Sequence, residues 1–126
     1  MAQKKNIKAV DAEAVLGKHV YIMICDWADR HGESDVNEPK VFNTLAKAHK
    51  ALADDVVAYV DQFGGWDGDG GKLNKDVIYD INYENLDELD TKAKLHKYAN
   101  KRSNMFINQD DDGTYANWSI HRVKVD

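Results

Sequence analysis

The chain has 126 residues, of which 43% are hydrophobic and 31% are charged. This size and balance are typical of one soluble globular domain and exclude a disordered chain, so we expect a single domain over residues 1–126. The formal net charge of −5 is unevenly spread, because residues 26–90 hold sixteen acids against six bases. An acidic middle region disfavours direct binding to a nucleic-acid backbone and favours a protein partner with a basic surface.

The sequence also bears on location. The longest apolar run, Val20 to Cys25, is far too short to span a bilayer. Residues 1–17 lack the continuous apolar core of a secretory signal, although Asp11 and Gly17 are suited to cap and end a short helix there. Cys25 is the single cysteine, so an intramolecular disulfide is excluded. We therefore expect a cytoplasmic protein without membrane association.

The first predicted element is a strand over residues 18–27, KHVYIMICDW. Apolar side chains occupy both of its faces, with Val20, Ile22 and Ile24 on one and Tyr21, Met23, Cys25 and Trp27 on the other. This pattern predicts a central strand that is covered on both sides for part of its length. Residues 40–42 are predicted to return as a partner strand. Because Pro39 cannot donate a ladder hydrogen bond, that strand is expected to lie at an edge or to begin there.

A helix is predicted over residues 44–63, capped by Asn43 or Thr44 and ended by Gly64-Gly65. Its apolar stripe follows steps of three and four residues: Leu45, Ala48, Leu52, Val56, Tyr59 and Phe63. Residues 64–75, rich in glycine and aspartate, predict a flexible loop.

The chain after residue 75 predicts a half-buried strand over residues 77–83 and a second helix. Asn85 and Glu88 form a capping box that would open this helix, which runs to about Lys101 and buries Leu86, Leu89, Ala93 and either Leu95 or His96. Residues 103–126 predict two strands around a DDDG turn. The fold class is therefore α+β, an antiparallel sheet of about four to five strands with two main helices packed on it.

The polar loop after the first strand suggests two interpretations. Asp26, Asp29, Glu38 and Lys40 resemble a nuclease pattern, in which carboxylates hold Mg²⁺ and a lysine lies near the attacking water. Pro39 counts against it, because that chemistry requires a well-paired strand. His31 in the same loop is a candidate base, with an exposed loop histidine as the alternative. The simpler interpretation of the whole segment is the solvated turn of a hairpin.

Other candidate sites are incomplete. Asn108, Asp110 and Asp112 match the first positions of a calcium loop, but Ser119 stands where a bidentate glutamate is needed. The glycine loop lacks the spacing of a phosphate-binding loop, and the five histidines lack the spacing of a zinc site. Trp66 within that loop either docks on the core or contacts a partner. We predict no cofactor.

The order of elements resembles a set of small, uncharacterised bacterial and phage-associated α+β proteins. The resemblance rests on a strand that ends in an acidic Trp-Ala-Asp loop (VYIMICDWADRHGESD), then KVF, then the helix opening NTLAKAHKAL, and finally YANWSIHRVKV. It covers residues 18–63 and 103–125. It implies a fold and no catalytic residues.

The sequence thus favours a non-enzymatic, acidic protein-binding module, in its sharper form a phage-type inhibitor of a nucleic-acid-binding protein. Trp27 and Trp66 are the candidate anchors, and the acidic field comes from Asp26, Asp29, Glu33, Asp35, Asp67 and Asp69. The alternative is a metal-dependent hydrolase or nuclease that uses Asp26, Asp29, Glu38 and Lys40. A third hypothesis is a calcium-responsive module.

Overall fold

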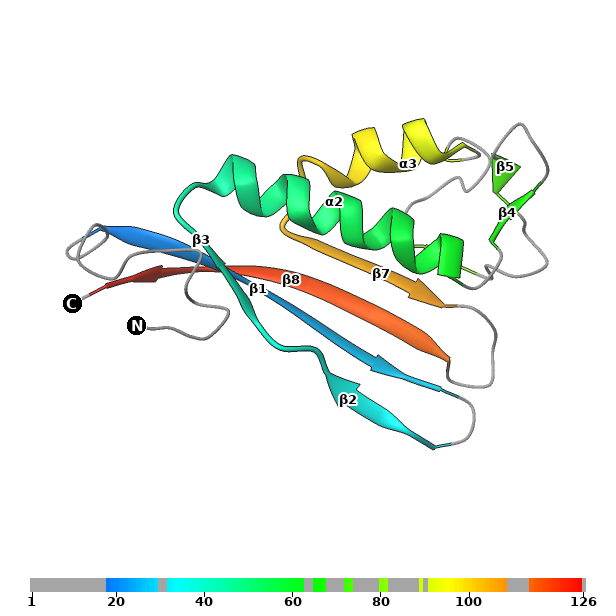
Figure 1. Cartoon of the computed structure of the whole chain (residues 1–126), viewed down its shortest axis with the longest axis horizontal. Coiled ribbons are helices and arrows are strands. Elements are labelled where there is room, and N and C mark those ends of the chain that lie inside the picture. The colour runs from blue at the N-terminus through cyan, green and yellow to red at the C-terminus, as the bar shows by residue number, and fades with distance from the viewer. Residues whose placement is uncertain are drawn as a thin grey trace.

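The computed structural model describes residues 18–29, 32–62, 65–67, 72–73, 80–81, 89, 91–108 and 114–125. These residues form an antiparallel sheet with two helices on one of its faces (Figure 1). The predicted α+β class is therefore confirmed. No helix in this described part of the chain combines the length and apolar character needed to cross a membrane.

The sheet has the strand order β2-β1-β8-β7-β6. The longest strands, β1 (His19–Ala28) and β8 (Tyr115–Lys124), pair over ten residues at its centre. On the far side of β8 follow β7 (Asn104–Asn108) and β6 (Asp80–Ile81). The two predicted terminal strands are thus confirmed as a pair, and the strand predicted over 77–83 is described only at Asp80–Ile81.

The other edge of β1 is shared by two short strands, β2 (Ser34–Val36) and β3 (Lys40–Phe42). Residues 37–39 interrupt this edge, and β3 begins directly after Pro39. Proline has no N–H to offer a ladder, so a break at this place is expected. The predicted edge position of the return strand is confirmed.

Both faces of β1 bury apolar side chains, as the alternation predicts. Met23 and Cys25 point toward the helices and belong to the main core. On the opposite face, Val20 and Val41 form a small second cluster, against which Ile22 and Val125 pack. Because apolar side chains pack on both faces of β1, its sequence is apolar at both sets of alternating positions.

Helix α2 (Leu45–Gln62) lies over one face of the sheet and runs roughly along β7 and β8 (Figure 1). Thr44 caps it, because its Oγ1 accepts a hydrogen bond of 3.2 Å from the Lys47 N–H. The Gly65 N–H donates to the Val60 carbonyl at 2.8 Å and closes the other end. Leu45, predicted to be buried, is 38% exposed, because the helix meets the core only from Ala48 onward. Phe63 lies outside the described residues.

Helix α3 (Lys92–Ala99) is shorter than predicted. The expectation of one continuous helix from Asn85 is wrong, because Thr91 has an extended backbone (φ −129°, ψ 159°) and caps α3 with its side chain. The predicted box at Asn85 and Glu88 lies outside the described residues. With this later start Leu95 is buried and Ala93 is exposed.

The predicted glycine-rich loop contains a two-stranded ribbon of β4 (Trp66–Asp67) and β5 (Lys72–Leu73). Leu73 is buried, and Trp66 packs against the core. The core itself lies between the sheet and the two helices. Its largest fully buried side chains come from every layer: Trp118, Leu52, Leu95, Met105, Ile107, Val56 and Val60.

Candidate functional site

A cleft of about 340 Å³ lies where the last turn of α2 meets the sheet. The end of β1 and the start of β8 are at the same end of the molecule as this turn (Figure 1). Tyr59 and Gln62 form the helical wall, and Thr114 and Ala116 belong to the β8 side. The volume is near the lower limit for small-molecule pockets, roughly 300 Å³, so the cleft suits one side chain or a small group.

The register of the sheet explains why this space is open. Cys25 is paired with Trp118, whereas two residues farther along β1 Trp27 is paired with Ala116. Directly paired residues project to the same face, so the helix-facing side chain of β8 changes from an indole to a methyl group at this point. Because α2 ends at Gln62, no further helical turn among the described residues fills the space.

Trp27 forms part of the cleft wall and is held in place by Asn37. Its Nε1–H donates to Asn37 Oδ1 at 3.2 Å. Asn37 is itself anchored, because its N–H donates to the Cys25 carbonyl at 2.8 Å. The break between β2 and β3 thus supplies the residue that orients the indole.

Asp29 brings a carboxylate to the cleft. Its Oδ1 accepts a hydrogen bond of 3.0 Å from the Glu33 N–H, and its own N–H donates to the Glu33 carbonyl at 2.8 Å. Gly32 within this turn has φ +85°, a conformation that favours glycine. The hairpin turn therefore fixes the backbone and one carboxylate oxygen of Asp29.

Next to the cleft, Trp118 is held under α2. Its Nε1–H donates to Asp55 Oδ2 at 3.1 Å, and its ring lies edge-on to Tyr59 with 5.4 Å between centroids. Burial, with the nearby Asp55 and Asp26 carboxylates, raises the pKa of the Cys25 thiol to about 12. Cys25 is thus a neutral wall of the cleft and not a nucleophile at neutral pH.

The structure separates the residues of the predicted nuclease pattern. By strand alternation, Asp26 projects to the face opposite Trp27, whereas Asp29 lines the cleft. Glu38 is exposed in the break before β3, and Lys40 is paired with Met23. Among the described residues, no group of three or more histidine, cysteine, aspartate or glutamate side chains is placed to hold a metal ion.

The predicted anchors are also separated. Both are partly buried against the core, but only Trp27 is among the residues that line the cleft. Trp66 Nε1 lies 3.5 Å from the Val57 carbonyl oxygen, and Lys92 Nζ lies 5.9 Å from the Trp66 ring centroid. Asp67 lies in β4, paired with Lys72. Asp69 and His31 lie outside the described residues.

The other acids of the hairpin lie close in the chain to the cleft residues Trp27 and Asp29. Glu33 and Asp35 are exposed, and Asp35 is the direct partner of Trp27 in the ladder. Of the calcium candidates, Asn108 ends β7, and Asp110 and Asp112 lie outside the described residues.

Sequence reasoning missed most of the cleft wall. The helical spacing of Tyr59 predicts a core position and not a cleft wall. Gln62, about one turn later, does not belong to the predicted apolar stripe. The sequence offers one indication of Asn37, because it is a polar residue shortly before a proline at a strand edge. It offers no indication of Thr114 and Ala116, because their position at the cleft depends on the register with β1.

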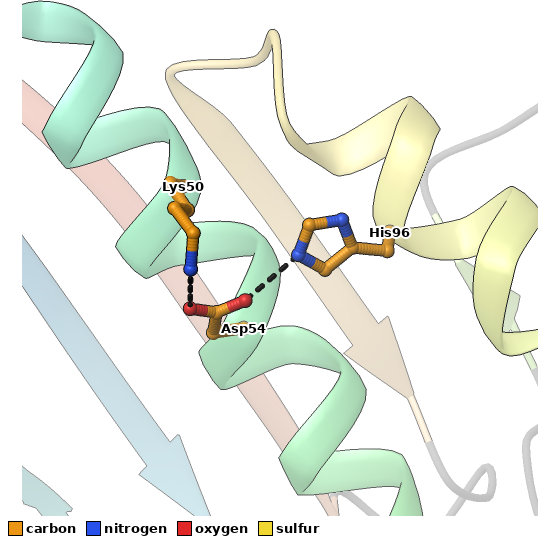
Figure 2. A network of polar contacts seen from close by, with 3 residues as sticks. All are labelled: Lys50, Asp54 and His96. Carbon is orange, nitrogen blue, oxygen red and sulfur yellow. Dashed lines mark hydrogen bonds and ion pairs between the residues drawn. The ribbon is translucent and has the colours of Figure 1, made fainter.

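A separate polar network joins the two helices, as Figure 2 shows. Asp54 on α2 contacts Lys50 Nζ at 2.9 Å and His96 Nε2 on α3 at 2.8 Å. The hydrogen bonds from Lys50 and then His96 hold the pKa of Asp54 below its usual value. Asp61 and Lys92 form a further contact between the helices at 3.5 Å. This network positions α3 and takes no part in lining the cleft.

Comparison of the chain with protein-family models, with curated proteins and with solved structures finds no match. The resemblance to small bacterial and phage-associated proteins stays a prediction. Function is therefore argued from the geometry of the cleft and its surroundings.

Proposed function

We propose that this chain is a non-enzymatic protein-binding module that engages a basic surface of a partner protein. One observation carries the proposal: the cleft combines a fixed aromatic side chain with a carboxylate, and it opens beside an acidic hairpin. The described hairpin residues hold five carboxylates, of Asp26, Asp29, Glu33, Asp35 and Glu38.

The two parts have different physical roles. Exposed carboxylates such as those of Glu33 and Glu38 contribute little binding energy each, but together they steer a basic partner and accelerate association. A partly buried aromatic side chain beside a cleft is the usual place where an interface gains most of its affinity. An acidic rim around an aromatic anchor therefore fits recognition of a basic protein surface.

The class of partner follows from the charge. Proteins that bind nucleic acids present clustered lysine and arginine side chains to phosphates. A hairpin with several carboxylates offers such a surface an alternative set of anions. We therefore propose a nucleic-acid-binding protein as the partner, with this chain as its inhibitor.

The experiment is an affinity capture from lysate of the source organism at low salt, followed by titration of the captured protein after purification. The test variant carries E33Q, D35N and E38Q, which remove three exposed hairpin charges. The matched control carries A46K, A58K and A93K, which change the net charge equally at exposed helix positions. We expect the hairpin variant to lose about tenfold or more in affinity and most of the salt dependence, and the control to lose much less.

A partner that binds both variants equally, or whose affinity is indifferent to salt, would overturn the proposal. Inhibition is read separately, as loss of the partner's nucleic-acid binding when this chain is added. If the captured partner still binds nucleic acid while in the complex, the binding role is supported and the inhibitory role is refuted.

A further inference from the structure

A basic surface lies at the end of the sheet away from the cleft. Here β1 begins and β8 ends, and Figure 1 shows that both extend beyond the start of α2. Arg122 and Lys124 of β8 are exposed, and so is Lys40 of β3 on the other side of β1. These cations come from distant parts of the chain, so only the register of the strands brings them to one surface.

Two aromatic rings lie between these cations. Tyr21 of β1 is paired with Phe42 on one side and with Arg122 on the other. Directly paired residues project to the same face, and neighbouring strands are about 4.8 Å apart, so the three side chains form a row across three strands. Phe42 packs against the main core, which places the row on the helix-facing side of the sheet. Both rings are partly exposed there.

Further cations flank the row at both of its ends. Lys40, two residues before Phe42, and Lys124, two residues after Arg122, project to the same face by strand alternation. Arg122 Nη2 donates to His19 Nδ1 at 3.2 Å. This contact holds the guanidinium on the sheet and uses one of its five N–H groups.

The acidic hairpin is separated from this surface. None of the described residues of β1, β3 and β8 that share a face with Tyr21 is acidic. Of the hairpin acids, Glu38 is nearest to Lys40 in the chain, whereas Glu33 and Asp35 lie beside the other end of β1. A strand of this length spans about 30 Å. That is several times the Debye length of about 8 Å at physiological salt, so those charges are largely screened at the basic surface.

We propose that the surface formed by Tyr21, Lys40, Phe42, Arg122 and Lys124 binds a single-stranded nucleic acid. Proteins that bind single strands combine cations along the phosphate backbone with aromatic side chains on which bases stack, and this surface has both. A duplex offers its phosphates but keeps its bases stacked inside, so it would not use the two rings. The inference does not depend on the proposed function, because that function uses the hairpin at the other end of β1.

The probe is a fluorescein-labelled oligothymidylate of about ten nucleotides, which is within the site size of such proteins. Fluorescence anisotropy follows its binding to the full chain. If three cations neutralise phosphates, the slope of log K against log salt is about −2, so affinity should fall roughly twentyfold between 50 and 200 mM salt. A duplex of the same length and heparin are the comparison ligands, and we expect both to bind at least about fivefold more weakly.

A pair of charge variants tests the cations. R122Q with K124Q removes two exposed charges of the surface, and we expect it to lose most of the binding and about two-thirds of the salt slope. K72Q with K97Q is the matched control, because it removes two exposed lysine charges from β5 and α3. We expect the control to change the affinity by less than about twofold.

A pair of tyrosine variants tests the rings. Y21L keeps an apolar side chain in the row and removes the ring, so we expect about tenfold weaker binding. Y115L is the matched control, because Tyr115 is also partly exposed but is paired with Ala28 at the other end of the ladder. We expect Y115L to have less than about twofold effect on affinity. Circular dichroism spectra establish that each variant is folded.

The outcomes decide the inference independently of the proposed function. Absence of binding at low salt would overturn it, and so would equal binding of the single strand, the duplex and heparin. An unchanged affinity of Y21L or of R122Q with K124Q would overturn the assignment of the surface. The hairpin variant with E33Q, D35N and E38Q should bind the single strand at least as well as the native sequence. If it binds less well, the site is not at the basic end.

Discussion

Two neighbouring parts of the β1–β8 ladder each hold a tryptophan, and they bury it to different extents. At the centre, Trp118 lies opposite Cys25, is 2% exposed and is bound to Asp55. Two residues farther along, Trp27 lies opposite Ala116, is half-buried and lines an open cleft. The partner across the ladder and the end of α2 account for the difference. One indole therefore belongs to the core and the other is available for binding.

The largest expected effect distinguishes the two indoles. Trp118→Ala should lower the free energy of unfolding by about 3–5 kcal/mol, because it leaves a cavity in the core and an unpaired Asp55. Trp27→Ala should cost about 1–2 kcal/mol, since its side chain is only half-buried. Urea denaturation monitored by circular dichroism measures both. Equal losses would contradict the distinction between a closed centre and an open cleft.

Cys25 sharpens the comparison, because it belongs to the core and also lines the cleft. Its raised pKa predicts that at pH 8 iodoacetamide alkylates the native chain about 1,000-fold more slowly than the urea-unfolded chain. Mass spectrometry follows the reaction. Native labelling within tenfold of the unfolded rate would show that the cleft exposes an ionised thiol.

The raised pKa of Cys25 also makes the free energy of unfolding depend on pH. The folded chain keeps the Cys25 proton to about pH 12, whereas the unfolded chain loses it near pH 9. The contribution of Cys25 is therefore fully present below pH 9 and is lost as the pH rises toward 12. Urea midpoints at pH 8 and pH 10.5 should differ more for the native sequence than for Cys25→Ala. If the urea midpoint changes equally between the two pH values in both chains, this prediction is refuted.

A smaller effect tests the helix that forms one wall of both regions. Thr44→Ala removes the N-cap of α2 and should cost about 1 kcal/mol, whereas Thr44→Ser keeps the hydroxyl and should cost much less. Thermal denaturation compares the three chains. Equal effects of the two substitutions would show that the Thr44 hydroxyl contributes no capping energy.

The smallest effect concerns Asp54, half-exposed between the helices. Its lowered pKa means that its contribution is present above pH 3.8 and is lost as the pH falls through its folded value. Asp54→Asn should cost a few tenths of a kcal/mol at pH 7, as for a surface pair, and less at pH 2. Denaturation curves at the two pH values measure this. A cost independent of pH would contradict it.

The sequence predicts elements better than it predicts sites. Alternation in residues 18–27 and the stripe in residues 44–63 give β1 and α2, because these patterns are local consequences of burial. The break at Thr91 depends on its extended backbone and its bridge to Lys72, nineteen residues earlier, which no local pattern reveals. The cleft depends on Ala116 facing Trp27 across the ladder. Trp27 and Asp29 were predicted as binding residues, but that both line one cleft follows only from the register between β1 and β8.

The pairing of β1 with β8 also has a consequence for folding kinetics. The ladder joins residues 19–28 to residues 115–124, so the whole of residues 29–114 must be closed into a loop before its first hydrogen bonds form. Local units such as α2 and the β7–β8 hairpin can form earlier, and contacts of such high sequence separation slow folding. During synthesis, β1 leaves the ribosome long before its central partner does. Until β8 follows, the apolar faces of β1 have to be kept from other chains, which exposes this strand to misassembly.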